Sequence, residues 1–313
     1  MREEDLYREL LATESRICRP SQREAWPITD YSGLMREETW RQAWDPDARA
    51  KGEVRSVTGN IWSDAIERCL QENGSVFIPM MPQPVFIDRP IVLHGGDRLI
   101  VHRETRILLK PDRAGTCMVR NAGIVFSQDR PVTIGAGADK GILIEGGIWS
   151  DQCNEGCGRG GCYDREGSMP GSHGIFLLHN VSGIVVRNVR FRDCSSFAIQ
   201  LGNASGFVVE GINLDETADG IHVEGPSVNG IIRHISGKTN DDLVALNAWD
   251  WDDSSLTFGP ITDVLVEDVE ALPGYTWSEL RLLPGTKVFP NGEKVACDIR
   301  RCVYRNIRGI HTV

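Results

Sequence analysis

The sequence predicts an all-β fold, a parallel β-helix, and its repeats are the main reason. Four five-residue segments align as one strand, with starts that differ by 24, 22 and 23 residues: His173–Leu177, Phe197–Leu201, Asp219–Val223 and Asp242–Leu246. Each is followed by a second apolar run, at 183–189, 206–212, 230–235 and 263–269. A period in the low twenties with two or three strands per turn and no helix is typical of stacked β coils.

The amino-acid composition and the placement of the glycines agree with this fold class. The chain has 313 residues, of which 41% are hydrophobic and 25% charged, and its 33 glycines fall between short apolar runs. Frequent glycine suits many tight turns. Leucine-rich repeats share the period, but their recurring Leu and Asn positions are absent. The strands of a sandwich or barrel would not align at a constant offset.

The chain divides into an N-terminal extension, 1–56, and a β-helix domain, 57–313. The extension is rich in charge and tryptophan, with one helix-like patch at 4–11 and no strand periodicity. A helix is then expected to bury Ile61, Ala65, Ile66, Cys69 and Leu70 and to end at Asn73-Gly74, before a first strand at 75–79. Such a helix caps the open end of a solenoid. The last residues, 310–313, follow a strand-like run without a visible cap, which is typical of a fragment or of an atypical end.

Charge and targeting signals exclude several classes. A formal net charge of -10 argues against a nucleic-acid partner. No apolar run is long enough to span a membrane, and the N-terminus lacks the apolar core of a signal peptide. The expected location is therefore the cytoplasm, or outside the cell if a leader has been removed. The sequence leaves the oligomeric state open.

The cysteines favour a reducing compartment, because nine is an odd number. Three of them, Cys153, Cys157 and Cys162, share a glycine-rich segment but lack CxxC spacing. That is a weak zinc signal, and free thiols in a loop are the alternative. We expect neither a metal nor another cofactor.

Equivalent residues of successive β-helix turns stack about 4.8 Å apart, so an alignment column is a column in space. Side chains alternate along a strand. The core is therefore expected to take Ile221, Val223, Val244 and Leu246. The expected outward residues, which would form the floor of a groove, are Gln200, His222 and Ala245. The small Gly220 and Ala245 would let a flat sugar ring approach.

Three aspartates converge in this arrangement. Asp219 and Asp242 share a column on adjacent turns, and Asp241 precedes the second of them. Like charges at this spacing raise one pKa, giving a protonated acid beside ionised partners, as cleavage of a glycosidic bond requires. The alternative is that each Asp merely bonds backbone amides at a turn.

Two segments carry a family resemblance: Thr217-Ala-Asp219-Gly-Ile-His-Val223 and Asn240-Asp241-Asp242-Leu-Val-Ala-Leu246. They resemble the Asn-Thr-Asp and Asp-Asp motifs of polygalacturonase-type glycoside hydrolases, and the match extends over about 57–283. The resemblance implies a right-handed parallel β-helix, a carbohydrate substrate and hydrolysis with inversion. It also implies that Asp242 is the acid, and that Asp219 and Asp241 position and activate water.

The sequence departs from that family at three places. Ser278-Glu-Leu-Arg281-Leu-Leu283 matches the Arg-Ile-Lys motif only at Arg281, with Leu283 in place of the lysine. The His-Gly motif is missing after Asp242, and His222 replaces an Asp that is common in the family. We expect His222 to take over part of the missing histidine's role, or to be a structural, hydrogen-bonded histidine. These departures leave the sugar open.

Further residues are candidates for substrate binding. Arg281 would hold a carboxylate or a pair of hydroxyls through its planar fork, or be an ordinary surface arginine. Trp249 and Trp251 would stack on sugar faces or pack within their loop. The neighbouring Asp250, with Asp252 and Asp253, would also suit calcium. His173 starts the column two turns before Asp219 and would border distant subsites.

Other activities fit the same scaffold. The first alternative to a hydrolase is a polysaccharide lyase, an epimerase or a glycosyl transferase, because one fold hosts several chemistries. The second is a non-catalytic, glycan-binding β-helix such as an adhesin. An acid-rich groove favours a hydrolase over a lyase.

Overall fold

The structure is a computed structural model that describes residues 3–17, 24–43, 46–111, 117–124, 139–152, 173–194, 196–250, 255–274 and 276–309. Its helical elements are α1 (Glu3–Ile17), η1 (Ile28–Leu34, a 3-10 helix), α2 (Pro46–Ala50) and α3 (Ser63–Asn73). The strands of the N-terminal half are β1 (Trp26–Pro27), β2 (Arg36–Gln42), β3 (Arg55–Ile61), β4 (Ser75–Ile78), β5 (Val85–Ile87), β6 (Ile91–Leu93), β7 (Arg98–Leu109), β8 (Val119–Asn121), β9 (Asp139–Lys140) and β10 (Leu143–Ser150). Those of the C-terminal half are β11 (Phe176–Arg187), β12 (Arg190–Phe191), β13 (Ile199–Thr217), β14 (Ile221–Thr239), β15 (Asp242–Asn247), β16 (Ile261–Ala271), β17 (Ser278–Leu283), β18 (Gly285–Val288), β19 (Lys294–Cys297), β20 (Ile299–Arg300) and β21 (Val303–Arg308).

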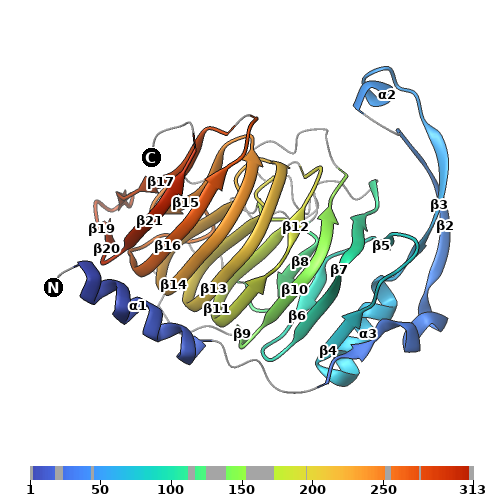
Figure 1. Ribbon diagram of the computed structural model, residues 1–313, viewed down its shortest axis with the longest axis horizontal. Coiled ribbons are helices and arrows are strands. Elements are labelled where there is room, and N and C mark those ends of the chain that lie inside the picture. Colours follow the sequence, from blue (N-terminus) through green and yellow to red (C-terminus); the bar gives the residue numbers. More distant parts are fainter. Residues whose placement is uncertain are drawn as a thin grey trace.

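The strands stack in parallel ladders along a coil (Figure 1). One ladder, named the site sheet below, runs through β6, β8, β11, β13, β14, β15 and β17. A second ladder, the back sheet, runs through β4, β7, β10, β11, β13, β14, β16 and β21. The longest strands, β13 and β14, bend through the corners and so belong to both. The predicted parallel β-helix is confirmed.

The predicted register is right for three of the four repeats. Ile199 pairs with Ile221 and Ile221 with Val244, as the alignment places them. The first repeat is one residue out, because Phe176 pairs with Ile199, which places Leu177 beside Gln200. Phe176, Leu177 and Leu178 are all buried, so apolar alternation could not fix the register there.

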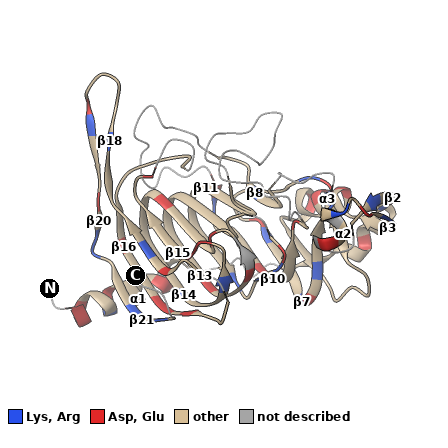
Figure 2. Cartoon of the chain, turned by 90° about the horizontal axis from the view of Figure 1, so that it is seen from above, with Lys and Arg blue, Asp and Glu red and all other residues tan. Residues whose placement is uncertain are grey.

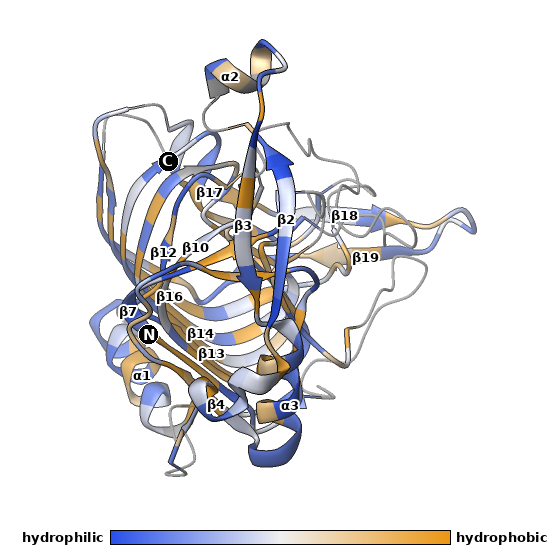
Figure 3. Ribbon diagram, turned by 90° about the vertical axis from the view of Figure 1, so that its right-hand side faces the viewer, coloured by the Kyte–Doolittle hydropathy of each residue, from blue (hydrophilic) through white to orange (hydrophobic). Residues whose placement is uncertain are grey.

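The interior of the coil is a continuous hydrophobic core, and its N-terminal end is covered (Figure 3). Helix α3 buries Ala65, Ile66, Cys69 and Leu70 in that core, as predicted, whereas Ile61, which was expected on the same helix, is the last residue of β3. Gly74 ends α3 in the left-handed conformation, with φ of 63°, and its N–H donates to the carbonyl of Leu70. The N-terminal cap therefore forms as the sequence indicates.

The first 56 residues hold more strand than the sequence suggested. β1 pairs with β4, and β2 and β3 form an antiparallel hairpin that stands at the N-terminal end of the coil (Figures 1 and 3). The expectation of an extension without strands was wrong. The reason is that β2 is largely charged (Arg-Glu-Glu-Thr-Trp-Arg-Gln) and mostly exposed, so apolar alternation is faint.

The predicted helical patch lies within α1, which packs on the outer face of the back sheet (Figure 1). Leu10 is buried there among Val208, Ile231 and Leu265. Arg233 of β14 also binds Glu14 through two guanidinium nitrogens, at 2.9 and 2.6 Å. One helix therefore bridges several coils.

Lys and Arg are interspersed with Asp and Glu along the described chain (Figure 2). Among the described residues, no helix combines the length and the apolar character that crossing a membrane requires.

Candidate active site

The three predicted aspartates lie together at the end of the site sheet where its strands begin. Asp219 precedes β14, Asp241 precedes β15, and Asp242 is the first residue of β15. One carboxylate oxygen from each lies within 4.8 Å of the others. The N–H of Asp242 donates to Oδ1 of Asp219 at 3.3 Å, which holds the two turns in register. The repeat length therefore produces the convergence.

Asp242 has the environment of an acid. Its Oδ1 accepts a short hydrogen bond from Ser278 Oγ, and its Oδ2 lies 3.4 Å from Arg281 Nη1. Burial, followed by the negative charge of Asp219, raises the pKa of Asp242 to about 6. The hydrogen bond from Ser278 and the charge of Arg281 act in the opposite direction but are weaker. Near pH 6, Asp242 is therefore about half protonated.

His222 is tied to Asp219 and fixed by a stacked ring. Its Nδ1 donates to Asp219 Oδ2 at 2.7 Å, and Phe197 stacks on the imidazole at 4.4 Å between centroids and 8° between planes. Burial lowers the pKa of His222, but the hydrogen bond to Asp219 and the charges of Asp219, Glu224 and Asp250 outweigh it. The net pKa is raised, so the imidazolium is favoured.

The residues that were expected to point outward do not form an exposed floor. Leu177, Gln200, His222, Ala245 and Arg281 follow one another across the site sheet. All except Arg281 are buried, so the expected open groove at Gln200, His222 and Ala245 was wrong. Strand alternation gives the direction of a side chain and leaves unspecified what covers it.

Gly220 and His173 also differ from expectation. A Cβ at Gly220 would collide with the carbonyl oxygen of Leu243, so this glycine serves close packing of the coils. His173 is buried, with its ring 5.0 Å from that of Phe197. It lies in a row of rings that ends at His222, instead of bordering an open groove.

The partly exposed residues beside the buried aspartates include Asp241 and Arg281, and a tryptophan that the sequence reasoning missed adjoins Asp241 through its backbone. Trp277 precedes the strand position paired with Asp242, and its N–H donates to the carbonyl of Asp241 at 2.9 Å. Its side chain is 65% exposed, whereas Asp219 and Asp242 are each 1% exposed. An alignment extended by one more repeat would have paired Ser278 with Asp242 and so placed Trp277 beside Asp241.

Two of the predicted binding residues, Trp249 and Asp250, lie in the described part of the loop after β15, and both pack within the protein. Trp249 is partly buried, with Phe258 edge-on at 5.9 Å and Lys287 Nζ 4.3 Å above its ring. This is packing within the protein. Asp250 is buried and accepts a hydrogen bond from Asn247 Nδ2 at 3.0 Å.

Several predicted residues lie outside the described part of the chain: Trp251, Asp252, Asp253, Cys153, Cys157 and Cys162. The alternatives of calcium next to Asp250 and of zinc at the cysteines depend on these residues, so the expectation of no metal stays a prediction.

Two more buried ionisable groups adjoin the site, and the sequence analysis did not select them. Glu224 lies two residues after His222 on the same side of β14, and His179 reaches it from β11. Burial raises the pKa of Glu224 to about 7 and lowers that of His179 to about 3. The sequence did contain a signal for Glu224, because this glutamate lies two residues after His222 in an otherwise apolar strand and so is expected on the same side.

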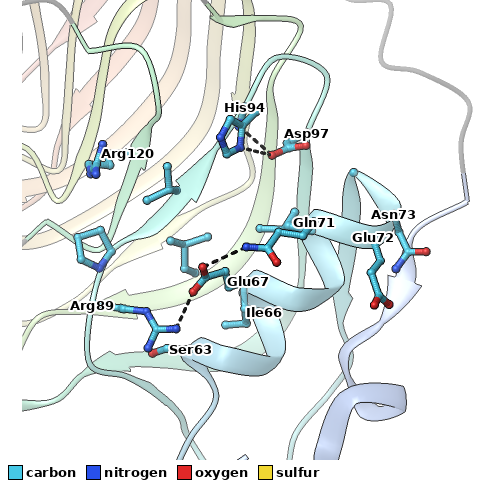
Figure 4. Close-up of a pocket in the computed structure, with 15 residues that line it drawn as sticks. Ser63, Ile66, Glu67, Gln71, Glu72, Asn73, Arg89, His94, Asp97 and Arg120 are labelled. Atoms are coloured by element: carbon cyan, nitrogen blue, oxygen red, sulfur yellow. Dashed lines mark hydrogen bonds and ion pairs between the residues drawn. The ribbon is translucent and has the colours of Figure 1, made fainter. Parts of the chain in front are cut away.

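A cavity of about 750 Å³ lies between α3 and the first strands of the site sheet (Figure 4). Its carboxylates are paired: Glu67 binds Arg89, and Asp97 accepts a hydrogen bond from the N–H of His94. Arg120 lines the cavity and belongs to the same outward column as Leu177. The cavity is thus on the same face as the aspartates, at the N-terminal end of the coil.

The chain matches no protein-family profile and no curated protein. Among solved structures, the exopolygalacturonase of Thermotoga maritima aligns with a TM-score of 0.60 and 13% identity, over 97% of this chain and 70% of that one. The Family 28 exopolygalacturonase of Yersinia enterocolitica gives 0.52 and 12%, over 84% and 55%. The surface adhesin PfbA of Streptococcus pneumoniae gives 0.50 and 12%, over 83% and 64%.

These similarities define the class by fold alone: the chain shares the right-handed parallel β-helix of these proteins. It spans little more than half of the Yersinia protein. Both exopolygalacturonases and an adhesin share this fold, so the activity has to be argued from the site.

Proposed function

We propose that this chain is a glycoside hydrolase that cleaves a glycosidic bond in an oligo- or polysaccharide by acid and base catalysis. The observation that carries the proposal is the aspartate trio, in which Asp242 has a pKa of about 6 beside two further carboxylates. A pair of carboxyl groups with pKa values pushed apart is the requirement for this reaction. The fold shared with exopolygalacturonases supports it.

The geometry suggests different roles for the three aspartates. Protonated Asp242 would donate its proton to the glycosidic oxygen as the bond to the anomeric carbon breaks. Asp241, which reaches the surface, would accept a proton from the water that attacks this carbon. Both oxygens of Asp219 are occupied, by His222 and by the N–H of Asp242, so its contribution would be its charge. The scheme regenerates both carboxyls after one proton returns to Asp242.

The substrate would approach beside Arg281 and Trp277. Arg281 contacts the carboxylate of Asp242 and is 29% exposed at its side chain, so it can also meet a substrate carboxylate. A sugar ring presents an apolar C–H face, for which an exposed indole is a suitable platform. We infer that an anionic, uronic-acid-containing sugar is the preferred substrate class.

A non-catalytic glycan-binding module is the second candidate, and one observation favours it. Asp219 and Asp242 are almost closed to solvent. The similar fold of the adhesin PfbA is compatible with this alternative. A lyase is less well supported, because its base would be His222, which is buried and bound to Asp219.

The test is hydrolysis across a panel of pectic and other plant oligosaccharides, with wild type and Asp242→Asn side by side. Reducing sugar released by wild type and lost in the variant would support a hydrolase. Ultraviolet absorbance of an unsaturated product would indicate a lyase. Glycan binding by both proteins without release would favour the binding module.

A further inference from the structure

A buried glutamate, Glu224, is the most unusual group beside the site. It lies on the outward side of β14 and is fully buried. Its Oε1 accepts a hydrogen bond from Gln200 Nε2 at 2.5 Å, and its Oε2 accepts from the N–H of Leu256 at 2.9 Å and of Thr257 at 3.4 Å. A buried carboxylate is costly unless donors surround it. These contacts are therefore specific to a carboxylate.

Gln200 extends the contact to the preceding coil. Its Oε1 accepts hydrogen bonds from the N–H groups of His173 at 2.7 Å and Gly174 at 2.9 Å. Glu224 and Gln200 together tie the backbone at 173–174 to the backbone at 256–257. These segments are far apart in the sequence, and the tie crosses the site sheet beside His222, since Gln200 and His222 are paired in register.

Two imidazoles face the same carboxylate. Nε2 of His179 lies 3.4 Å from Glu224 Oε2, and Nε2 of His222 lies 3.9 Å from Oε1. Both nitrogens are buried without a hydrogen-bond partner. Gly202 makes room for this arrangement, because a Cβ there would collide with the ring of His179. The described groups that face the Glu224 carboxylate are thus hydrogen-bond donors, or are imidazole nitrogens that can carry a proton and donate it.

We propose that Glu224 is a positioning residue for the reaction at the aspartates, acting through His222. This inference rests on the proposed function. Glu224 does not touch substrate, because it is fully buried. It faces Nε2 of His222 and, when ionised, favours a proton there, while Nδ1 keeps donating to Asp219. His222 thereby holds the Asp219 carboxylate in one orientation, next to Asp242.

The charges around His222 show why Glu224 matters. The ionisable groups that face the imidazole are Asp219, Glu224, Asp250 and His179. Asp219 already engages Nδ1, so Glu224 is the carboxylate nearest to Nε2 among the described contacts. Replacing Glu224 with glutamine keeps the size and removes the charge. His222 should then lose its second proton more easily.

The first measurement is an NMR titration of the histidine ring signals in wild type and in Glu224→Gln, with the His222 signal assigned by its loss in His222→Gln. We expect the pKa of His222 to fall by about one pH unit or more in Glu224→Gln, since an opposite charge at this distance favours the charged imidazole. The matched control is Glu267→Gln. Glu267 is a buried glutamate of β16 in the back sheet, and it accepts a hydrogen bond from Tyr7 of α1. An unchanged His222 titration in Glu224→Gln would overturn the proposal.

The second measurement separates positioning from a merely structural role. On the sugar that wild type hydrolyses, and at pH 7 or above, where Glu224 is ionised in at least half of the molecules, Glu224→Gln should lower kcat at least about tenfold while KM changes little, and Glu224→Asp should restore part of the activity. Equal kcat for wild type and Glu224→Gln would refute positioning. If wild type hydrolyses nothing on the panel, the proposed function fails, whereas the titration still decides whether Glu224 controls His222.

Wild type also gives a result if Glu224→Gln does not fold. Burial raises the pKa of Glu224 to about 7, so the His222 ring signals should show a second inflection near that pH. If the titration curve of the His222 ring signals had a single inflection and no change near pH 7, it would contradict the coupling between Glu224 and His222.

Discussion

Replacing Asp242 with asparagine should make the folded chain more stable at neutral pH, although it should abolish hydrolysis. The pKa of Asp242 is raised from 3.8 to about 6, so the folded state binds this proton more tightly than the unfolded chain does. The proton therefore contributes stability below pH 3.8, and that contribution is lost as the pH rises through 6. Above pH 6, the ionised carboxylate is a cost that asparagine removes.

The magnitude follows from the two pKa values. A rise from 3.8 to about 6 corresponds to about 3 kcal/mol in the free energy of unfolding at pH 8. The pKa of about 6 already includes the opposing effects of Ser278 and Arg281, and the asparagine amide can still accept the hydrogen bond from Ser278. We expect a gain of about 3 kcal/mol at pH 8, and about 0.5 kcal/mol at pH 4.

Urea unfolding followed by circular dichroism, at pH 4, 6 and 8, measures this difference. The matched control is Asp298→Asn, since Asp298 is about half exposed and far along the chain from the aspartate trio. Its stability should follow that of wild type at each pH. If Asp242→Asn were no more stable than wild type at pH 8, or if the gain were the same at pH 4, the electrostatic account of the site would be wrong.

Three further predictions concern activity and packing. The kcat/KM of wild type should fall as the pH rises through about 6, because Asp242 loses the proton that it donates, and a pH-rate profile on the hydrolysed sugar checks this. Gly202→Ala should destabilise the fold by about 1 to 3 kcal/mol in urea, because the new methyl group collides with His179, and an unchanged stability would mean that the ring moves freely. Trp277→Ala should raise KM about tenfold without loss of stability, whereas Trp26→Ala, which alters an exposed tryptophan at the other end of the coil, should leave KM unchanged.

The aspartate trio was predictable because stacking converts sequence period into distance. Once residues 219 and 242 share a column, their carboxylates have to be neighbours. The α3 cap was predictable for a similar reason, since its apolar face and Gly74 are local signals.

The burial of the site was not predictable from the same signals. The burial of this face depends on how segments outside the strands fold back, as the 256–257 backbone does when it binds Glu224. No periodicity encodes such a contact. The one-residue register error at Phe176 has a different cause. Three consecutive residues are buried there, so no alternation of apolar and polar residues indicates the register.

Helix α1 changes how this solenoid should lose its structure. In a coil where each turn touches only its neighbours, turns can fray from either end one after another. Here α1 contacts β11, β13, β14, β16 and β21, so five ladder positions share one partner. Arg301 near the C-terminal end also binds Glu9 of α1 at 2.8 Å. The coils that carry the aspartates are therefore held in a single cooperative unit, and unfolding any one of them has to release the helix from all.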